Sequence, residues 1–192
     1  MWDIAGPWHV AFEAPYESPR PITLPTLQSL SENGDEAVKY FSGTAIYTTD
    51  LHVASDGVKG CRRLWLDLGD VEVIAEVELN GWPLGVLWHP PYRMDVTKAI
   101  RTGRNTLKIK VTNQWLNRVL GDRRYPDDVV WTTRTGSTAA GMGPAAIPEW
   151  VRQHTARPSA CRRTFTGWQW PHHATKKPLP AGLIGPVRVV VE

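Results

Sequence analysis

The stretch from Asn113 to Trp131, NQWLNRVLGDRRYPDDVVW, gathers side chains that could bind a sugar. Carboxylate, amide and guanidinium groups supply the paired donors and acceptors that sugar hydroxyl groups need. A tryptophan ring can also stack on the apolar C–H face of a pyranose. The pattern therefore predicts a sugar-binding loop, and the alternative is a rigid loop held by Arg–Asp pairs. The candidate residues of this stretch are Asn117, Arg118, Asp122, Asp127, Asp128 and Trp131.

Catalysis by this chain would need carboxylates, and the candidates are Asp122, Asp127, Asp128 and Glu149. Glycosidases use two carboxyl groups, about 5–5.5 Å apart for retention or about 6.5–9.5 Å apart for inversion. Asp127 and Asp128 are adjacent, and adjacent side chains of an extended chain point to opposite faces. Asp127 could meet Asp122 or Glu149 across a fold, but the spacing does not require it. A small self-sufficient glycosidase is therefore an alternative hypothesis with no assigned catalytic pair.

A second aromatic pair, Trp168 and Trp170, lies at spacing two in CRRTFTGWQW (161–170). On a strand both rings would share one face and could form a stacking platform for a sugar, unless another element covers that face. The adjacent His172 and His173 lack a third ligand placed by the sequence, so no metal site is predicted. The two cysteines, Cys61 and Cys161, have no zinc-type spacing. Either a single disulfide or two free thiols agrees with the sequence.

The elements that must position these residues read as β-strands. Apolar residues alternate with polar ones at period two, as in half-buried strands. The runs with this pattern are 6–12, 40–53, 62–70, 71–80, 101–115, 161–170 and 185–192, and prolines interrupt a further run at 82–96. Asn80-Gly81 favours a two-residue hairpin turn. Trp65 and Trp82 are expected on a sheet face or in the core, and PEWVRQHT (148–155) is expected to form a short helix.

This count of about eight to ten strands with long loops predicts one all-β domain over residues 1–192, an antiparallel β-sandwich or jelly roll. The 192 residues carry a net charge of +3, and their Arg-Arg pairs are scattered between acids, which argues against nucleic-acid binding. No run of about 18 apolar residues indicates a membrane span. The N-terminus lacks the basic and apolar regions of a signal peptide, and the compartment is left open.

The order of these motifs resembles the sugar-binding, galactose-binding-like jelly-roll domain of large glycoside hydrolases. The stretches that carry the resemblance are KYFSGTAIYTTDL (39–51), the run from LWLDLGD to LNRVLGD (64–122) and AGLIGPVRVVVE (181–192). The sequence is most similar to family 106 α-L-rhamnosidases and more distantly to the family 2 β-galactosidases and β-glucuronidases. The resemblance covers nearly the whole chain, and it indicates the domain much more specifically than any substrate.

The resemblance implies a division of labour between this chain and a partner. In those enzymes the catalytic carboxylates lie on a separate (β/α)₈ barrel of about 250 residues, for which this chain has no room. Loops of the sandwich reach the barrel's active site in family 2 enzymes, and GDRRYPDDVVW (121–131) matches such a loop. The expected partners are thus a carbohydrate and a catalytic barrel. A structural domain that only docks on the barrel is a further alternative. Domains of this type often hold a structural calcium, for which no ligand is assigned.

Overall fold

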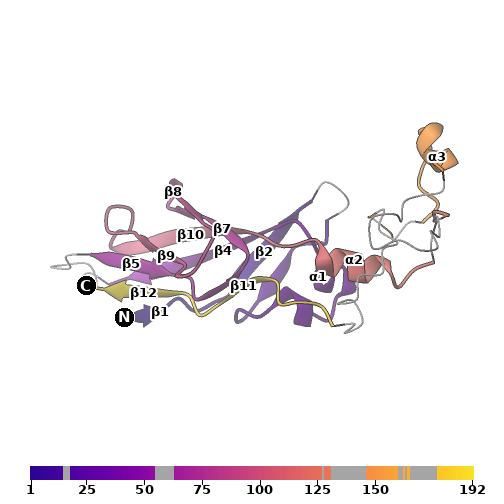
Figure 1. The fold of residues 1–192 in the computed structure, drawn as a ribbon. Helices are drawn as coiled ribbons and strands as arrows, with labels where there is room; N and C mark the ends of the chain where they lie inside the picture. The colour runs from indigo at the N-terminus through magenta and orange to yellow at the C-terminus, as the bar shows by residue number, and fades with distance from the viewer. Residues whose placement is uncertain are drawn as a thin grey trace.

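The computed structural model describes residues 1–14, 18–54, 63–126, 128–130, 146–159, 162, 164 and 177–192. Two antiparallel sheets form the body of the molecule (Figure 1). The larger sheet has the order β3-β2-β4-β10-β7-β8, with β3 at Ile22–Leu24, β2 at Trp8–Glu13, β4 at Thr44–Val53, β10 at Gly103–Thr112, β7 at Ile74–Leu79 and β8 at Trp82–Leu87. The second has the order β1-β12-β5-β9, with β1 at Trp2–Asp3, β12 at Arg188–Val191, β5 at Leu64–Asp67 and β9 at Arg93–Asp95. The predicted all-β sandwich is confirmed.

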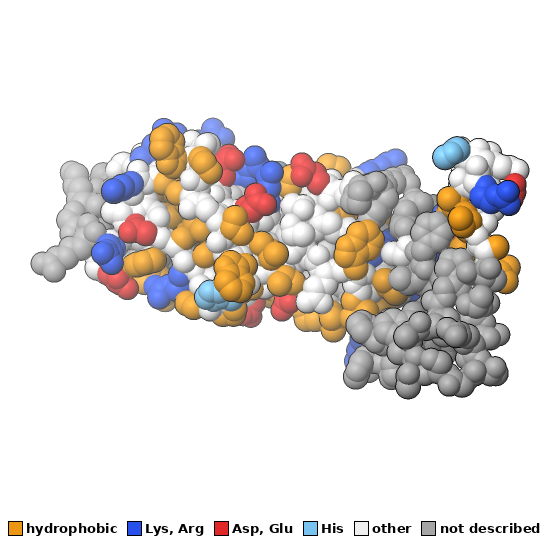
Figure 2. Space-filling model, turned by 45° about the horizontal axis from the view of Figure 1, so that its top comes forward, with side chains coloured by type: hydrophobic (Ala, Val, Ile, Leu, Met, Phe, Trp, Pro, Cys, Tyr) orange, Lys and Arg blue, Asp and Glu red, His pale blue; other side chains and the backbone are white. Residues whose placement is uncertain are grey.

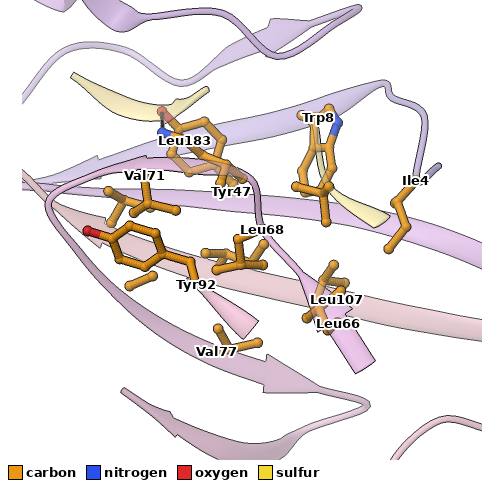
Figure 3. Packing of buried hydrophobic residues seen from close by; sticks show 14 of the residues in the cluster. Ile4, Trp8, Tyr47, Leu66, Leu68, Val71, Val77, Tyr92, Leu107 and Leu183 are labelled. Carbon is orange, nitrogen blue, oxygen red and sulfur yellow. Dashed lines mark hydrogen bonds between the residues drawn. The ribbon is translucent and has the colours of Figure 1, made fainter. Parts of the chain in front are cut away.

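The core lies between the two sheets, where the alternating residues of each strand meet. Leu107, Ile109 and Val111 of β10 are fully buried, while Lys108 and Lys110 between them point away from the core. Figure 3 shows how the layers meet: Tyr47, Val77 and Leu107 of the larger sheet pack near Leu66 and Leu68 on the β5 side. The Tyr47 hydroxyl accepts a hydrogen bond from the backbone N–H of Leu183 at 3.1 Å, so this buried phenol is satisfied.

The alternating run 71–80 is not one strand, and this differs from the sequence expectation. β6 (Asp70–Glu72) pairs with β11 (Gly182–Gly185) in a separate two-stranded sheet, whereas β7 pairs with β10 and β8. Buried and exposed residues alternate in both β6 and β7, because each strand buries one face. The alternation therefore does not reveal that the chain passes from one sheet to another. The predicted turn at Asn80-Gly81 does join β7 to β8, with φ of 56° at Asn80 and 79° at Gly81.

Within the described residues, four short helical elements interrupt the strands. They are a 3₁₀ turn at Leu30–Glu32, α1 at Glu36–Lys39, α2 at Leu116–Asp122 and α3 at Glu149–Arg152. The predicted helix near Pro148 is confirmed as α3, whereas α2 occupies a stretch expected to be loop. α2 has no side-chain cap at its N-terminus, so tertiary contacts must hold it. Within the described residues, no helix has both the length and the apolar character required to cross a membrane.

Candidate functional site

The segment that follows β10 is fixed to the start of β4 before it enters α2. The side-chain amide of Asn113 donates to the carbonyl of Phe41 at 2.9 Å and accepts from the N–H of Gly43 at 3.0 Å. The hydroxyl of Ser42 donates to the carbonyl of Gln114 at 2.8 Å and accepts from the N–H of Arg118 at 3.3 Å. These bonds place α2 at one end of the sandwich, to the right in Figure 1. We call this region the loop end: α2, residues 123–126, 128–130, 146–159, 162 and 164, and Leu179.

Asn117, predicted as a sugar ligand, uses its amide to hold a neighbouring part of the chain. Its Nδ2 donates to the carbonyl of Leu179 at 2.8 Å, and its Oδ1 accepts from the N–H of Leu179 at 2.8 Å. The side chain is buried at the base of α2. This reciprocal pair satisfies a backbone donor and acceptor without a β-ladder, and it ties α2 to the segment that leads into β11.

Arg118 and Asp122 face each other one turn apart on α2. The guanidinium Nη2 of Arg118 lies 2.9 Å from Oδ1 of Asp122, whose side chain is fully buried. The other carboxylate oxygen, Oδ2, accepts a hydrogen bond from the backbone N–H of Thr164 at 2.5 Å. A buried carboxylate needs such partners, because burial of an unpaired charge costs several kcal/mol, on the order of the protein's whole stability margin.

Asp128 forms the second ion pair of the loop end, with Arg157. The guanidinium donates from Nε to Oδ2 at 2.6 Å and from Nη2 to Oδ1 at 2.9 Å, a bidentate geometry. The hydrogen bonds from Arg157 lower the pKa of the Asp128 carboxyl below its ordinary value, and the same bonds raise the pKa of Arg157. Arg157 also stacks over the ring of Trp150, with its guanidinium carbon 5.4 Å from the ring centroid.

Thr164 and Arg162 join the two ion pairs into one network. The carbonyl of Thr164 accepts from Nη2 of Arg157 at 2.9 Å, while its N–H donates to Asp122. Arg162 donates from Nη1 to the carbonyl of Tyr125 at 3.0 Å, and its Nε lies 4.0 Å from Oδ1 of Asp128. We call the set Arg118, Asp122, Asp128, Arg157, Arg162 and Thr164 the ion network. Three guanidinium groups face two carboxylates, all largely buried.

The sequence-predicted site is thus partly assembled in the described residues. Asn117, Arg118, Asp122 and Asp128 come together at the loop end, and each is engaged with other protein groups. Asp127, Trp131, Trp168 and Trp170 lie outside the described residues, as do Cys61 and Cys161. The sugar contacts assigned to this set therefore stay a prediction.

The carboxylates considered for catalysis occupy unlike surroundings. Glu149 lies on the exposed side of α3, where it accepts from Gln153 at 2.7 Å and pairs with Arg152 at 3.4 Å. Asp128 has a lowered pKa because of Arg157. A glycosidase general acid needs the opposite, a raised pKa that keeps its proton near neutral pH. The ion pairs of Asp122 and Asp128 suit the alternative of a loop held by Arg–Asp contacts.

Arg157, Arg162 and Thr164 are the network members that sequence reasoning missed. A usable signal was present: the acids of 122–128 and the arginines of 157–163 are segments of opposite charge on either side of a region without periodicity. Opposite charges that are buried together stabilise each other, so such segments are candidates for pairing. Among the described residues, no group of three His, Cys, Asp or Glu side chains could hold a metal ion. The structural calcium suggested by the resemblance stays untested.

Apolar side chains are exposed around the ion network. Figure 2 shows hydrophobic side chains beside the charged ones of the α3 region. Val130 is 77% exposed and Ile147 is 66% exposed. The exposed large apolar residues of the loop end are Val130, Ile147, Val151 and Leu179, and Trp115, just before α2, is exposed as well. The loop end therefore combines a buried polar interior with an apolar exterior, which is typical of a surface that contacts another protein unit.

The antiparallel sandwich, with its loop end beyond β10, defines the class of the protein as a jelly-roll-type all-β domain. Comparison with known sequences identifies the family. Residues 28–184 match the model of the glycosyl hydrolase 2 galactose-binding domain-like family, and the chain belongs to that family. The predicted resemblance is confirmed, and the chain is a galactose-binding-like domain of the type that this family describes.

Two relatives match nearly the whole chain. A protein of Formosa agariphila provisionally named β-glucuronidase is 40% identical over 190 residues, which are 98% of this chain and 15% of that protein. The solved structure of a rhamnosidase from Novosphingobium sp. PP1Y is 36% identical, with a TM-score of 0.66, and the match covers 100% of this chain and 15% of that one. The chain thus spans about one seventh of the length of these relatives.

Proposed function

We propose that this domain serves a larger glycoside hydrolase by seating its loop end against the catalytic domain and contributing sugar contacts there. The observation that carries the proposal is the ion network. Its bonds connect α2 with Tyr125, Asp128, Arg157, Arg162 and Thr164, and in the part of the chain that the structure describes no β-ladder joins these residues. Such a network fixes the positions of loops that would otherwise have few contacts, and fixed loops are what a shared active site requires.

The apolar exterior of the loop end supports the docking part of the proposal. Val130 and Ile147 have large side chains exposed to solvent in the isolated chain. Burying apolar surface contributes about 25 cal/mol for each Å² removed from water. Covering these residues with a catalytic domain would stabilise the docked complex by this free energy. The ion network would keep Val130 and Ile147 in place for docking.

Asp127 and Trp131 carry the sugar-contact part of the proposal. Asp127 directly precedes the anchored Asp128, and Trp131 directly follows the exposed Val130. An acid and an indole next to a fixed backbone can supply hydrogen bonds to hydroxyl groups and a stacking surface. Trp168 and Trp170 are proposed to add a second stacking surface.

The rhamnosidase of Novosphingobium sp. PP1Y offers a direct test, because its matching region can be replaced by this chain. We expect the chimaera to hydrolyse a nitrophenyl rhamnoside, and Val130→Asp to lower kcat/KM at least about tenfold by misplacing the domain. Val86→Asp is the matched control, since Val86 is also exposed but lies on the edge strand β8. A folded but inactive chimaera, or equal loss in both variants, would contradict docking through the loop end.

The sugar-contact part is separated from docking in the same chimaera. Asp127→Ala and Trp131→Ala should raise KM or lower kcat while leaving the chimaera's thermal unfolding midpoint unchanged. A loss of activity that follows the loss of folded protein would assign these residues to docking alone. Hydrolysis by the isolated 192-residue chain would instead favour the alternative of a self-sufficient glycosidase.

A further inference from the structure

A second candidate site lies on the side of the sandwich where both sheets end. β8 is the last strand of the larger sheet and β9 is the last strand of the smaller one. Between β8 and the turn that follows β9, a cleft of about 560 Å³ opens to solvent. We call it the edge cleft, and the lining residues used below are Arg63, Trp82, Leu84, Asp95, Thr97 and Lys98. Its volume falls in the range of small-molecule sites, about 300–1,000 Å³.

Trp82 gives the edge cleft an apolar wall that is available to a ligand. It is the first residue of β8 and pairs with Leu79, so both lie on the core-facing side of the sheet. Leu79 is buried there, whereas Trp82 extends past the edge of the core and is 69% exposed. Sequence reasoning expected Trp82 on a sheet face or in the core, and the structure places it at the sheet edge. A ring held on a strand and open on its face is suited to stack against an apolar surface.

The two walls of the cleft are held together at their base. The amide Nδ2 of Asn80, in the turn before Trp82, donates to the carbonyl of Ala99 at 3.0 Å and to Oδ1 of Asn105 at 2.8 Å. On the other wall, the hydroxyl of Thr97 accepts from the N–H of Leu64 at 2.8 Å. The cleft is therefore formed before any ligand arrives, which lowers the entropy cost of binding.

Two cations lie at the rim of the edge cleft. Among the described residues, neither Arg63 nor Lys98 forms an ion pair. Asp95, the one carboxylate among the described lining residues, accepts from the N–H of Thr97 at 2.9 Å. Hydrogen bonds from Thr97 are the main cause that lowers the pKa of Asp95, and the charges of Arg63 and Lys98 add to the effect. The described part of the lining thus holds two cations and one carboxylate, an excess of positive charge beside an exposed indole.

We propose that the edge cleft binds a pyranose that carries an anionic group, either a carboxylate or a sulfate ester. The sugar's C–H face would stack on Trp82, and its anionic group would lie between Arg63 and Lys98. Asp95 and Thr97 would accept hydrogen bonds from hydroxyl groups of the sugar. A ligand with both an apolar face and a negative charge matches this lining, whereas a simple anion has no apolar face that could stack on the indole.

This site is separate from the loop end and does not rest on the function proposed there. The cleft lies beside the residues that lead into β10 at Gly103, while α2 follows the other end of β10 at Thr112. Ten residues of strand span about 30 Å. A failure of the edge-cleft inference would therefore leave the loop-end proposal untouched, and the reverse also holds.

The test is a nuclear magnetic resonance titration of the 192-residue chain with four matched probes: galacturonic acid, galactose 6-sulfate, galactose and sodium sulfate. The indole N–H signal of Trp82 is assigned by its loss in Trp82→Phe. We expect at least one anionic sugar to shift this signal with a dissociation constant of about 1–10 mM. Galactose should bind at least about fivefold more weakly, and sodium sulfate should leave the signal in place. Raising the salt concentration should weaken the binding of the anionic sugar, since the cations are exposed.

Matched variants separate the edge cleft from the rest of the surface. Trp82→Ala, which lacks the indole signal and is therefore followed by the backbone amide signals of Thr97 and Lys98, should weaken binding about tenfold, the loss expected for one stacked ring. Trp88→Ala is its control, because Trp88 is 68% exposed just beyond the other end of β8. Replacing Arg63 and Lys98 together by Gln should remove the preference for the anionic sugar, and Arg20→Gln, at another exposed position, should not. All these side chains are exposed, so the variants are expected to fold.

Three results would overturn the inference. If neither anionic sugar shifts the Trp82 signal at 50 mM, the cleft is not a sugar site. If galactose binds as tightly as the anionic sugars, the two cations are not part of the recognition. If sodium sulfate shifts the signal as strongly as they do, the cleft holds an adventitious anion only.

Discussion

The two ends of β10 are held by different kinds of polar group. At its C-terminal end the ion network joins residues that are up to 46 positions apart, from Arg118 to Thr164. At its N-terminal end the neutral amides of Asn80 and Asn105 hold two turns together, and Asn105 is fully buried. We call Asn80 and Asn105 the amide pair. Buried charged groups form stronger hydrogen bonds than amides, but a buried charge that loses its partner costs more folding free energy. Removing one partner of an amide pair costs less folding free energy.

The difference between the amide pair and the ion network matches the segments that each of them holds in place. The amide pair fixes tight turns that neighbour each other in the sheet, and the backbone already brings them close. The ion network fixes segments that enter no ladder of the described sheets, so side chains must supply the contacts that hydrogen-bonded strands supply elsewhere. The stability of the loop end should therefore depend on pH and on changes of charge. The stability of the turns beneath the edge cleft should depend little on either.

The largest effect is expected from Asp122→Ala, which leaves the buried Arg118 without its partner and the N–H of Thr164 without its acceptor. Breaking a buried ion pair by removing one member costs about 3–5 kcal/mol of folding free energy. Urea unfolding followed by circular dichroism measures this loss. Glu149→Ala is the matched control, since Glu149 is an exposed acid of the same loop end. An unchanged midpoint in Asp122→Ala would show that the network adds nothing to global stability.

The amide pair is tested by Asn105→Ala. The side chain of Asn105 donates to the carbonyls of Arg101 and Gly103 and accepts from Arg101 N–H and Asn80. Its loss leaves several buried polar groups unpaired, at about 3 kcal/mol in total. Unlike the change expected at Asp122, this loss should be the same at high and low salt. Asn33→Ala, which removes a single exposed acceptor, is the control.

The sandwich could be predicted from the sequence because each strand carries its own evidence. The alternation in β10 and the Asn80-Gly81 turn each depend on residues that are neighbours in the chain. The division of 71–80 between two sheets could not be predicted, because the pattern of buried and exposed residues is the same on both sides of it. Local periodicity reports which face is buried and not which partner strand covers it.

The site was predicted less completely than the fold. The structure brings Asn117, Arg118, Asp122 and Asp128 together at the loop end, while their predicted sugar contacts stay a prediction. The partner of Asp128 is Arg157, which is 29 residues away. Arg–Asp pairing across such a distance follows from tertiary structure and leaves no local pattern. The edge cleft was missed for the same reason. Trp82 begins the edge strand of the larger sheet, Lys98 follows the edge strand of the smaller sheet, and only the fold brings them together.

The ion network should also be more sensitive to acid than the amide pair. Arg157 lowers the pKa of Asp128 in the folded chain below the ordinary value of 3.8. A depressed folded-state pKa contributes stability that is complete above the unfolded value and is lost as the pH falls through the folded value. Asp128→Asn should therefore cost about 1.5–3 kcal/mol at neutral pH, and the difference from the parent should shrink below about pH 4. A difference that stays constant down to pH 2, measured by urea unfolding, would contradict this account.

The smallest effect is expected at an exposed ion pair near the amide pair. Arg104 donates from Nη2 to Oδ2 of Asp50 at 2.7 Å, and its side chain is 79% exposed. The distance is shorter than that between Arg118 and Asp122, yet solvent screens the charges and both long side chains lose freedom when they pair. Arg104→Ala should leave the urea midpoint unchanged. A shift as large as that of Asp122→Ala would mean that distance, and not burial, decides what an ion pair contributes in this domain, and the contrast between the two ends of β10 would then fail.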